Sequence, residues 1–180
     1  MKIAVISTGN GGQAMSAYLS QAGYEVALYA REQERVDMFE SRRFTLTGIV
    51  QCETELALIS CDMKKVIEGA ELIMVTTPAQ YHPVVAREMS PHLADGQTVV
   101  LNPGRTLGTN VFAKTLRDCG CKAQIYLAET DTFVFTCRCV KSGHPAIYAI
   151  KKNLRAAAHD PQNTPKVVAL LRQIFPHVLP

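Results

Sequence analysis

Three glycines stand within four positions near the start of the chain, in the stretch STGNGGQA. Gly9, Gly11 and Ala14 follow the order G-x-G-x-x-A, between an apolar run and a helical pattern. In such a turn the first glycine permits a tight bend, the second lets a pyrophosphate approach the backbone, and the small third residue lets the helix pack closely. The helix N-terminus adds free N–H groups and a partial positive charge. The spacing predicts a dinucleotide turn, and a glycine-rich corner without a ligand is the alternative.

The end of the second apolar run indicates which dinucleotide would bind. Sites selective for NAD carry Asp or Glu about 20 residues beyond the first glycine, where the acid binds the ribose 2′-hydroxyl. Ala30 occupies that position here, and Arg31 follows it. The planar guanidinium of arginine can donate two hydrogen bonds to a 2′-phosphate. We therefore expect the chain to bind NADP, with Arg31 contacting the 2′-phosphate and Arg35 assisting. NAD is the alternative, since Glu32 is adjacent and Arg31 could be only a solvated charge.

Two further segments follow apolar runs and are rich in turn residues. Thr76-Thr77-Pro78-Ala79 follows ELIMV, and Asn102-Pro103-Gly104 follows TVVL. Ligands of open parallel sheets bind beyond the carboxyl ends of the strands. We therefore expect both segments to line the ribose and nicotinamide, although both are also typical of plain turns.

Three side chains near these segments could act on a substrate. His82 is a candidate general acid, with a surface or capping role as the alternative. Arg105 and Arg138 could bind a substrate carboxylate, and either could instead be structural or merely exposed.

The elements that would position these residues alternate between strands and helices. Short apolar runs predict strands at 3–6, 26–30, 71–75, 98–101 and 123–127, and periodic segments predict helices at 12–22, 32–40, 63–68, 79–93, 110–119 and 164–175. A period-two pattern over 45–58 predicts a hairpin inserted at the sheet edge, and segments 133–140 and 146–150 predict late mixed strands. The expected fold is α/β, a Rossmann-type doubly wound, mostly parallel sheet.

Composition narrows the classes of protein and partner. The 180 residues are 47% hydrophobic and 19% charged, with a net charge of +3 and no long basic run, so a folded core is expected and nucleic-acid binding is not. No segment is apolar enough to span a membrane and no signal peptide is recognisable, so we expect a cytoplasmic protein. The six cysteines are expected as free thiols, and the spacing of their two C-x-C pairs predicts no metal.

Several stretches together resemble a known group of enzymes. GNGGQA, ARE, LTG, GAELIMVTTPA, LNPG and AETDTFVFTCR resemble the N-terminal half of opine dehydrogenases of the octopine/nopaline type. The layout is also similar to the N-terminal domains of NAD(P)-dependent glycerol-3-phosphate dehydrogenase and ketopantoate reductase. The resemblance implies these cofactor-binding positions: Gly9, Asn10, Gly11, Gly12, Ala14, Arg31, Thr77, Pro78 and Ala79.

The resemblance also implies a reaction and separate domains for the cofactor and the substrate. Opine dehydrogenases condense an amino acid with a 2-keto acid and reduce the imine with NAD(P)H. Their catalytic histidine lies in a second, largely helical substrate domain, which is absent from these 180 residues, so no catalytic residue is assigned. We expect residues 1–180 to form the dinucleotide-binding domain, with an apolar face that could support a homodimer. The alternative is a non-catalytic module that binds or senses NAD(P).

Overall fold

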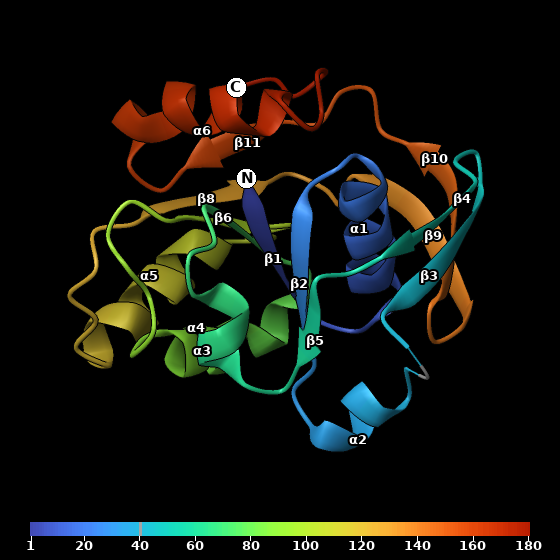
Figure 1. Ribbon diagram of the computed structural model, residues 1–180. Helices are drawn as coiled ribbons and strands as arrows, with labels where there is room; N and C mark the ends of the chain where they lie inside the picture. Colours follow the sequence, from blue (N-terminus) through green and yellow to red (C-terminus); the bar gives the residue numbers. More distant parts are fainter. Residues whose placement is uncertain (40) are drawn as a thin grey trace.

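The computed structural model describes residues 1–39 and 41–180. Its main sheet, which lies at the centre of Figure 1, has seven strands. Their order is β11-β8-β7-β6-β1-β2-β5, and every neighbouring pair is parallel except β11 with β8. The strands are β1 (Lys2–Ile6), β2 (Glu25–Tyr29), β5 (Leu58–Ser60), β6 (Leu72–Val75), β7 (Thr98–Leu101), β8 (Tyr126–Thr130) and β11 (Ala156–Ala158). This confirms the predicted doubly wound α/β fold.

Helices cover both faces of this sheet. One face carries α3 (Met63–Ile67), α4 (His82–Met89, preceded by the short η1, Ala79–Tyr81) and α5 (Gly108–Asp118). The other carries α1 (Asn10–Gln21) and α6 (Thr164–Arg172, preceded by η2, Pro161–Asn163). In β1, Ile3 and Val5 face α1, whereas Ala4 and Ile6 face the opposite layer. Because both faces are buried, the inner strands are continuously apolar instead of alternating.

A second sheet corrects the expected place of the hairpin and the late strands. β3 (Arg43–Gly48) and β4 (Cys52–Glu55) do form a hairpin, but it does not extend the main sheet. With β10 (His144–Ile150) and β9 (Phe135–Lys141) it forms a four-stranded sheet, ordered β4-β3-β10-β9. This sheet packs on α1 (Figure 1). The alternating sequence of these strands gives the second sheet one apolar face, and that face covers α1. A strand of the main sheet must be apolar on both faces, because helices cover both sides of it.

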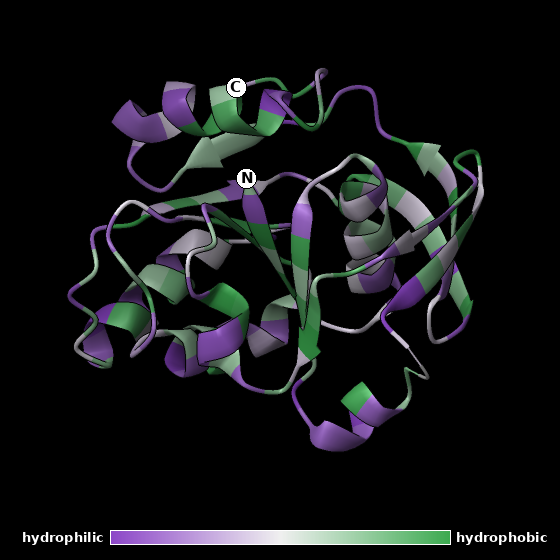
Figure 2. Ribbon diagram, viewed as in Figure 1, coloured by the Kyte–Doolittle hydropathy of each residue, from purple (hydrophilic) through white to green (hydrophobic). Residues whose placement is uncertain are grey.

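Several predicted bounds shift in the structure. The strand predicted at 123–127 lies at β8, three residues later, and β11 was not predicted. The helix predicted over 32–40 is the short α2 (Gln33–Asp37), and residue 40 lies outside the described residues. Figure 2 shows α2 as mostly hydrophilic, in keeping with its lack of buried residues. Within the described ranges, no helix is long and apolar enough to cross a membrane.

Candidate functional site

The glycine turn joins β1 to α1 at the carboxyl edge of the main sheet. Gly12 is the residue that this junction requires, because a Cβ there would overlap the backbone carbonyl of Ser7. Gly9 instead has φ −69°, which any residue adopts, and the left-handed backbone falls on Ser7 with φ 130°. The Ser7 hydroxyl accepts a hydrogen bond from the Gly9 N–H at 3.1 Å. The tight bend that the sequence assigned to Gly9 is therefore made at Ser7.

The first turn of α1 also contacts the second sheet. A Cβ on Gly11 would lie 2.9 Å from the Phe133 ring, so this position is crowded as well. The Asn10 side-chain oxygen accepts a hydrogen bond from the Cys139 N–H at 2.9 Å, and so it ties α1 to β9. The thiols of Cys137 and Cys139 both approach the Asn10 carbonyl, which places this C-x-C pair on one face of β9.

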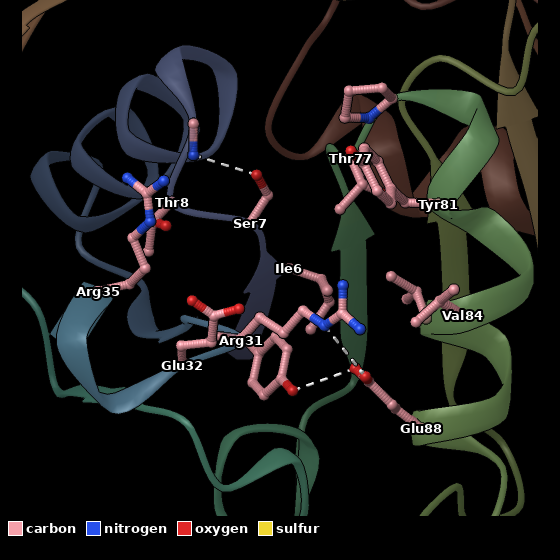
Figure 3. A pocket seen from close by; sticks show the side chains of 14 residues that line it. Ile6, Ser7, Thr8, Arg31, Glu32, Arg35, Thr77, Tyr81, Val84 and Glu88 are labelled. Atoms are coloured by element: carbon pink, nitrogen blue, oxygen red, sulfur yellow. Dashed lines mark hydrogen bonds and ion pairs between the residues drawn. The ribbon is translucent and has the colours of Figure 1, made fainter.

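A cavity of about 340 Å³ opens between the glycine turn, the end of β2 and helix α4 (Figure 3). Gly9, Arg31, Arg35, Thr77 and Pro78, all singled out from the sequence, line it. The other lining residues are Ile6, Ser7, Thr8, Tyr29, Glu32, Tyr81, Val84, Val85 and Glu88. An apolar wall on α4 and two arginines near the end of β2 make a shape suited to an adenosine with a nearby phosphate.

The exposed Arg31 side chain pairs with an acid on α4. Its Nε lies 3.6 Å from the Glu88 Oε1, and the Tyr29 hydroxyl donates to the Glu88 Oε2 at 3.1 Å (Figure 3). Burial, followed by the Glu88 carboxylate, raises the pKa of Tyr29, so the phenol stays protonated as the donor. Sequence reasoning missed Glu88 because no local spacing connects it with Arg31, and it missed Tyr29 because that residue belongs to the apolar run of β2.

A second cavity, of about 730 Å³, lies beyond the ends of β6 and β7. Thr77 and Pro78 line both cavities, so the two hollows meet at the turn after β6. The Thr77 hydroxyl and the Asn102 amide nitrogen are buried and find no hydrogen-bond partner among the described residues. Two such orphaned groups at strand ends are typical of a site that a polar ligand completes.

The second cavity gathers most of the remaining predicted site residues. Its lining includes Asn10, Gly11, Ala79, Asn102, Pro103, Arg105 and Arg138, together with Lys151, which the sequence analysis did not single out. Three cations therefore converge here from three segments of the chain. Gly12 and Ala14 line neither cavity, and Ala14 is fully buried within α1.

His82 is neither a surface residue nor part of either cavity lining. Only 1% of it is exposed, and its ring packs edge-on against Phe112 with centroids 6.5 Å apart. Burial lowers its pKa, although the Thr77 backbone and the Glu129 carboxylate oppose this effect. The buried position does not support the general-acid assignment. The Glu129 carboxylate accepts a hydrogen bond from the Thr109 N–H at 2.8 Å, near the start of α5.

The family model that matches this chain, over residues 2–125, is described as the N-terminus of NAD-dependent glycerol-3-phosphate dehydrogenase. An opine dehydrogenase from Arthrobacter sp. (strain 1C) is 30% identical over 154 residues, which are 82% of this chain and 42% of that protein. A glycerol-3-phosphate dehydrogenase [NAD(P)+] from Parvibaculum lavamentivorans is 36% identical over 103 residues, which are 56% of this chain and 30% of that protein. The chain thus spans less than half the length of these relatives.

The fold of this chain is similar to that of a solved structure. Octopine dehydrogenase with NADH and L-arginine superposes with a TM-score of 0.82 at 22% identity, covering 99% of this chain and 48% of that one. At this level of identity the likeness concerns the fold alone. It includes the Rossmann-type arrangement that the sequence predicted.

Proposed function

This chain belongs to the family of NAD-dependent glycerol-3-phosphate dehydrogenase N-terminal domains, and on that premise we propose that it binds NADP(H). Residues 1–180 then form the dinucleotide-binding domain of an oxidoreductase. One observation carries the proposal: two cavities meet at Thr77 and Pro78, on the carboxyl edge of the sheet, with the start of α1 beside them. A dinucleotide needs this sequence of adenosine pocket, pyrophosphate turn and nicotinamide pocket.

The residues present fit such a ligand. Gly12 keeps α1 close to β1, so the helix N-terminus, which has no side-chain cap at Gly9, can face a pyrophosphate. Arg31 and Arg35 can bind a 2′-phosphate at the end of β2. The orphaned Thr77 hydroxyl and Asn102 amide offer hydrogen bonds to the nicotinamide end, where Pro78 and Ala79 supply a rigid wall. A bound nicotinamide supplies hydride, and the protein supplies orientation and electrostatics.

The proposed substrate is a keto or imino acid, as in the reductive condensation of an amino acid with a 2-keto acid. The opine dehydrogenase relative supports this class of reaction. Arg105, Arg138 and Lys151 line the cavity beyond the nicotinamide end, where their charges suit a carboxylate. The test is oxidation of NADPH in the presence of 2-keto acids, with and without amino acids.

The possible results separate the candidate reactions. Oxidation that needs both acids supports an opine dehydrogenase. Oxidation with dihydroxyacetone phosphate, or with ketopantoate, would place the protein with the other two groups that its layout resembles. Because the resemblance places the catalytic histidine in a second domain, cofactor binding without turnover by residues 1–180 alone fits both the cofactor domain of such an enzyme and the non-catalytic module.

Substitution of Arg31 tests the proposed cofactor. In Arg31→Asp a carboxylate replaces the guanidinium and repels a 2′-phosphate, so we expect NADPH affinity to fall by more than about tenfold while NADH affinity changes little. Fluorescence titration of both reduced cofactors measures the two affinities. Equal losses for the two cofactors would contradict the role given to Arg31.

A further inference from the structure

Two acids line the adenosine cavity, Glu32 just beyond β2 and Glu88 on helix α4, and Glu88 is the one that pairs with Arg31. Glu88 lies across the cavity from the glycine turn, and its two carboxylate oxygens have different partners (Figure 3). Oε1 faces the Arg31 Nε at 3.6 Å, and Oε2 accepts the Tyr29 hydroxyl at 3.1 Å. The carboxylate is therefore held in place by a residue of β2 while it attracts the arginine that follows that strand.

The ion pair is of a kind that a ligand can rearrange. The Arg31 side chain is 59% exposed and the Glu88 side chain 31%, so water screens their attraction. The pair joins one guanidinium nitrogen to one carboxylate oxygen, which leaves other N–H groups of Arg31 available. A phosphate monoester with a charge of about −1.5 to −2 competes well with a single carboxylate for such a guanidinium.

The charges of the residues that line the cavity are balanced. The charged lining residues are two arginines and two acids: Arg31, Arg35, Glu32 and Glu88. The ribose 2′-hydroxyl of NAD is neutral, so these charges have little effect on the affinity for NAD. A 2′-phosphate must draw Arg31 away from Glu88 and then lie near a carboxylate that has lost its partner.

We propose that Glu88 is a specificity-determining residue of this cavity, which holds Arg31 when no 2′-phosphate is present and so limits the preference for NADP over NAD. The inference rests on the proposed dinucleotide binding. In this arrangement Arg31 attracts the 2′-phosphate, Glu88 opposes it, and Tyr29 positions Glu88. The protein then accepts both cofactors with a smaller difference in affinity than Arg31 alone would produce.

The decisive variant is Glu88→Gln, which keeps the side-chain shape and an oxygen for Tyr29 but removes the charge. Its affinities for NADPH and NADH are measured by fluorescence titration of the 180-residue chain. We expect NADPH binding to strengthen by about fivefold, as loss of one exposed charge pair allows, and NADH binding to change by less than about twofold. Glu25→Gln is the matched control, because it removes one acid from the opposite end of β2.

A double-mutant comparison tests whether Glu88 acts through Arg31. In an Arg31→Gln background we expect Glu88→Gln to strengthen NADPH binding by much less than in the wild type. An undiminished effect there would mean direct repulsion only, and would overturn the holding role. Tyr29→Phe should move the NADPH-to-NADH affinity ratio in the same direction as Glu88→Gln, but less.

The outcomes separate this inference from the function on which it rests. If the wild-type chain binds neither cofactor, dinucleotide binding itself fails. If it binds NADPH but Glu88→Gln leaves the affinity ratio unchanged, only the role of Glu88 fails. If Glu88→Gln weakens NADH alone, Glu88 is an acceptor for the ribose hydroxyl, and the proposed role is again overturned.

Discussion

At the scale of single residues, the glycine turn combines a requirement of the fold with a requirement of the ligand. A methyl group on Gly12 would strike the Ser7 carbonyl, which belongs to the backbone and cannot turn aside. A methyl group on Gly9 would meet only the Ser7 hydroxyl oxygen, at 3.4 Å. Gly12 is therefore required by the fold, although it stands at a variable position of the G-x-G-x-x-A motif, whereas the space around Gly9 would admit a methyl group.

Alanine substitutions at these two positions should separate folding from binding. We expect Gly12→Ala to destabilise the protein by about 1–3 kcal/mol, the usual cost of overpacking, because α1 must move away from β1. Gly9→Ala should leave stability within about 0.5 kcal/mol and weaken NADPH binding, since Gly9 lines the adenosine cavity, into which the added methyl group would intrude. Thermal unfolding and NADPH titration of both variants measure these effects. Equal stability of the two variants would contradict the structural account of Gly12.

The residues that could be predicted were those whose role follows from local order along the chain. Arg31 and Thr77 each follow an apolar run, and parallel strands bring their carboxyl ends to one edge. Glu88 gives no such signal, because it stands within a helix among ordinary polar positions. Its partners, Tyr29 and Arg31, lie at and just after the end of β2, and only the folded chain brings that strand end close to α4.

At the scale of elements, α1 is held from two sides. Its inner side packs on the main sheet, and its outer side carries the four-stranded second sheet. Two of its amides bind that sheet: Asn10 accepts the Cys139 N–H, and Gln13 accepts the Gly143 N–H, both at 2.9 Å. The sequence predicted the hairpin and both late strands, but their pairing depends on contacts between distant segments, which alternation alone does not specify.

Asn10 offers a way to separate these ties from cofactor binding. In Asn10→Asp the carboxylate keeps an acceptor for the Cys139 N–H and suits the positive end of α1, so stability should be unchanged or slightly raised. The same charge beside a pyrophosphate should weaken NADPH binding by more than about tenfold.

The matched variant is Asn10→Ala, which should lose about 1 kcal/mol of stability through the missing hydrogen bond while it retains cofactor binding. Chemical denaturation and NADPH titration report the two properties separately. NADPH binding to Asn10→Asp with wild-type affinity would show that the pyrophosphate does not lie at this turn.

At the scale of the whole molecule, one aromatic cluster joins three layers. Phe175, just after α6, stacks on Tyr18 of α1 with ring centroids 5.8 Å apart and meets Phe135 of the second sheet at 6.0 Å. Tyr18 and Phe135 lie 5.1 Å apart, which closes the triangle. Because one buried cluster spans α6, α1 and β9, the main sheet and the second sheet should unfold together.

Phe175→Ala tests this coupling. Phe175 is only 5% exposed, so its truncation should cost about 3–5 kcal/mol and lower the melting temperature by about 10 °C. Unfolding should remain a single transition, coincident by circular dichroism and by tyrosine fluorescence. The exposed Val140, in contrast, should tolerate alanine with no measurable change. Two separate transitions in Phe175→Ala would mean that the second sheet is an independent unit, and that the glycine turn keeps its shape without it.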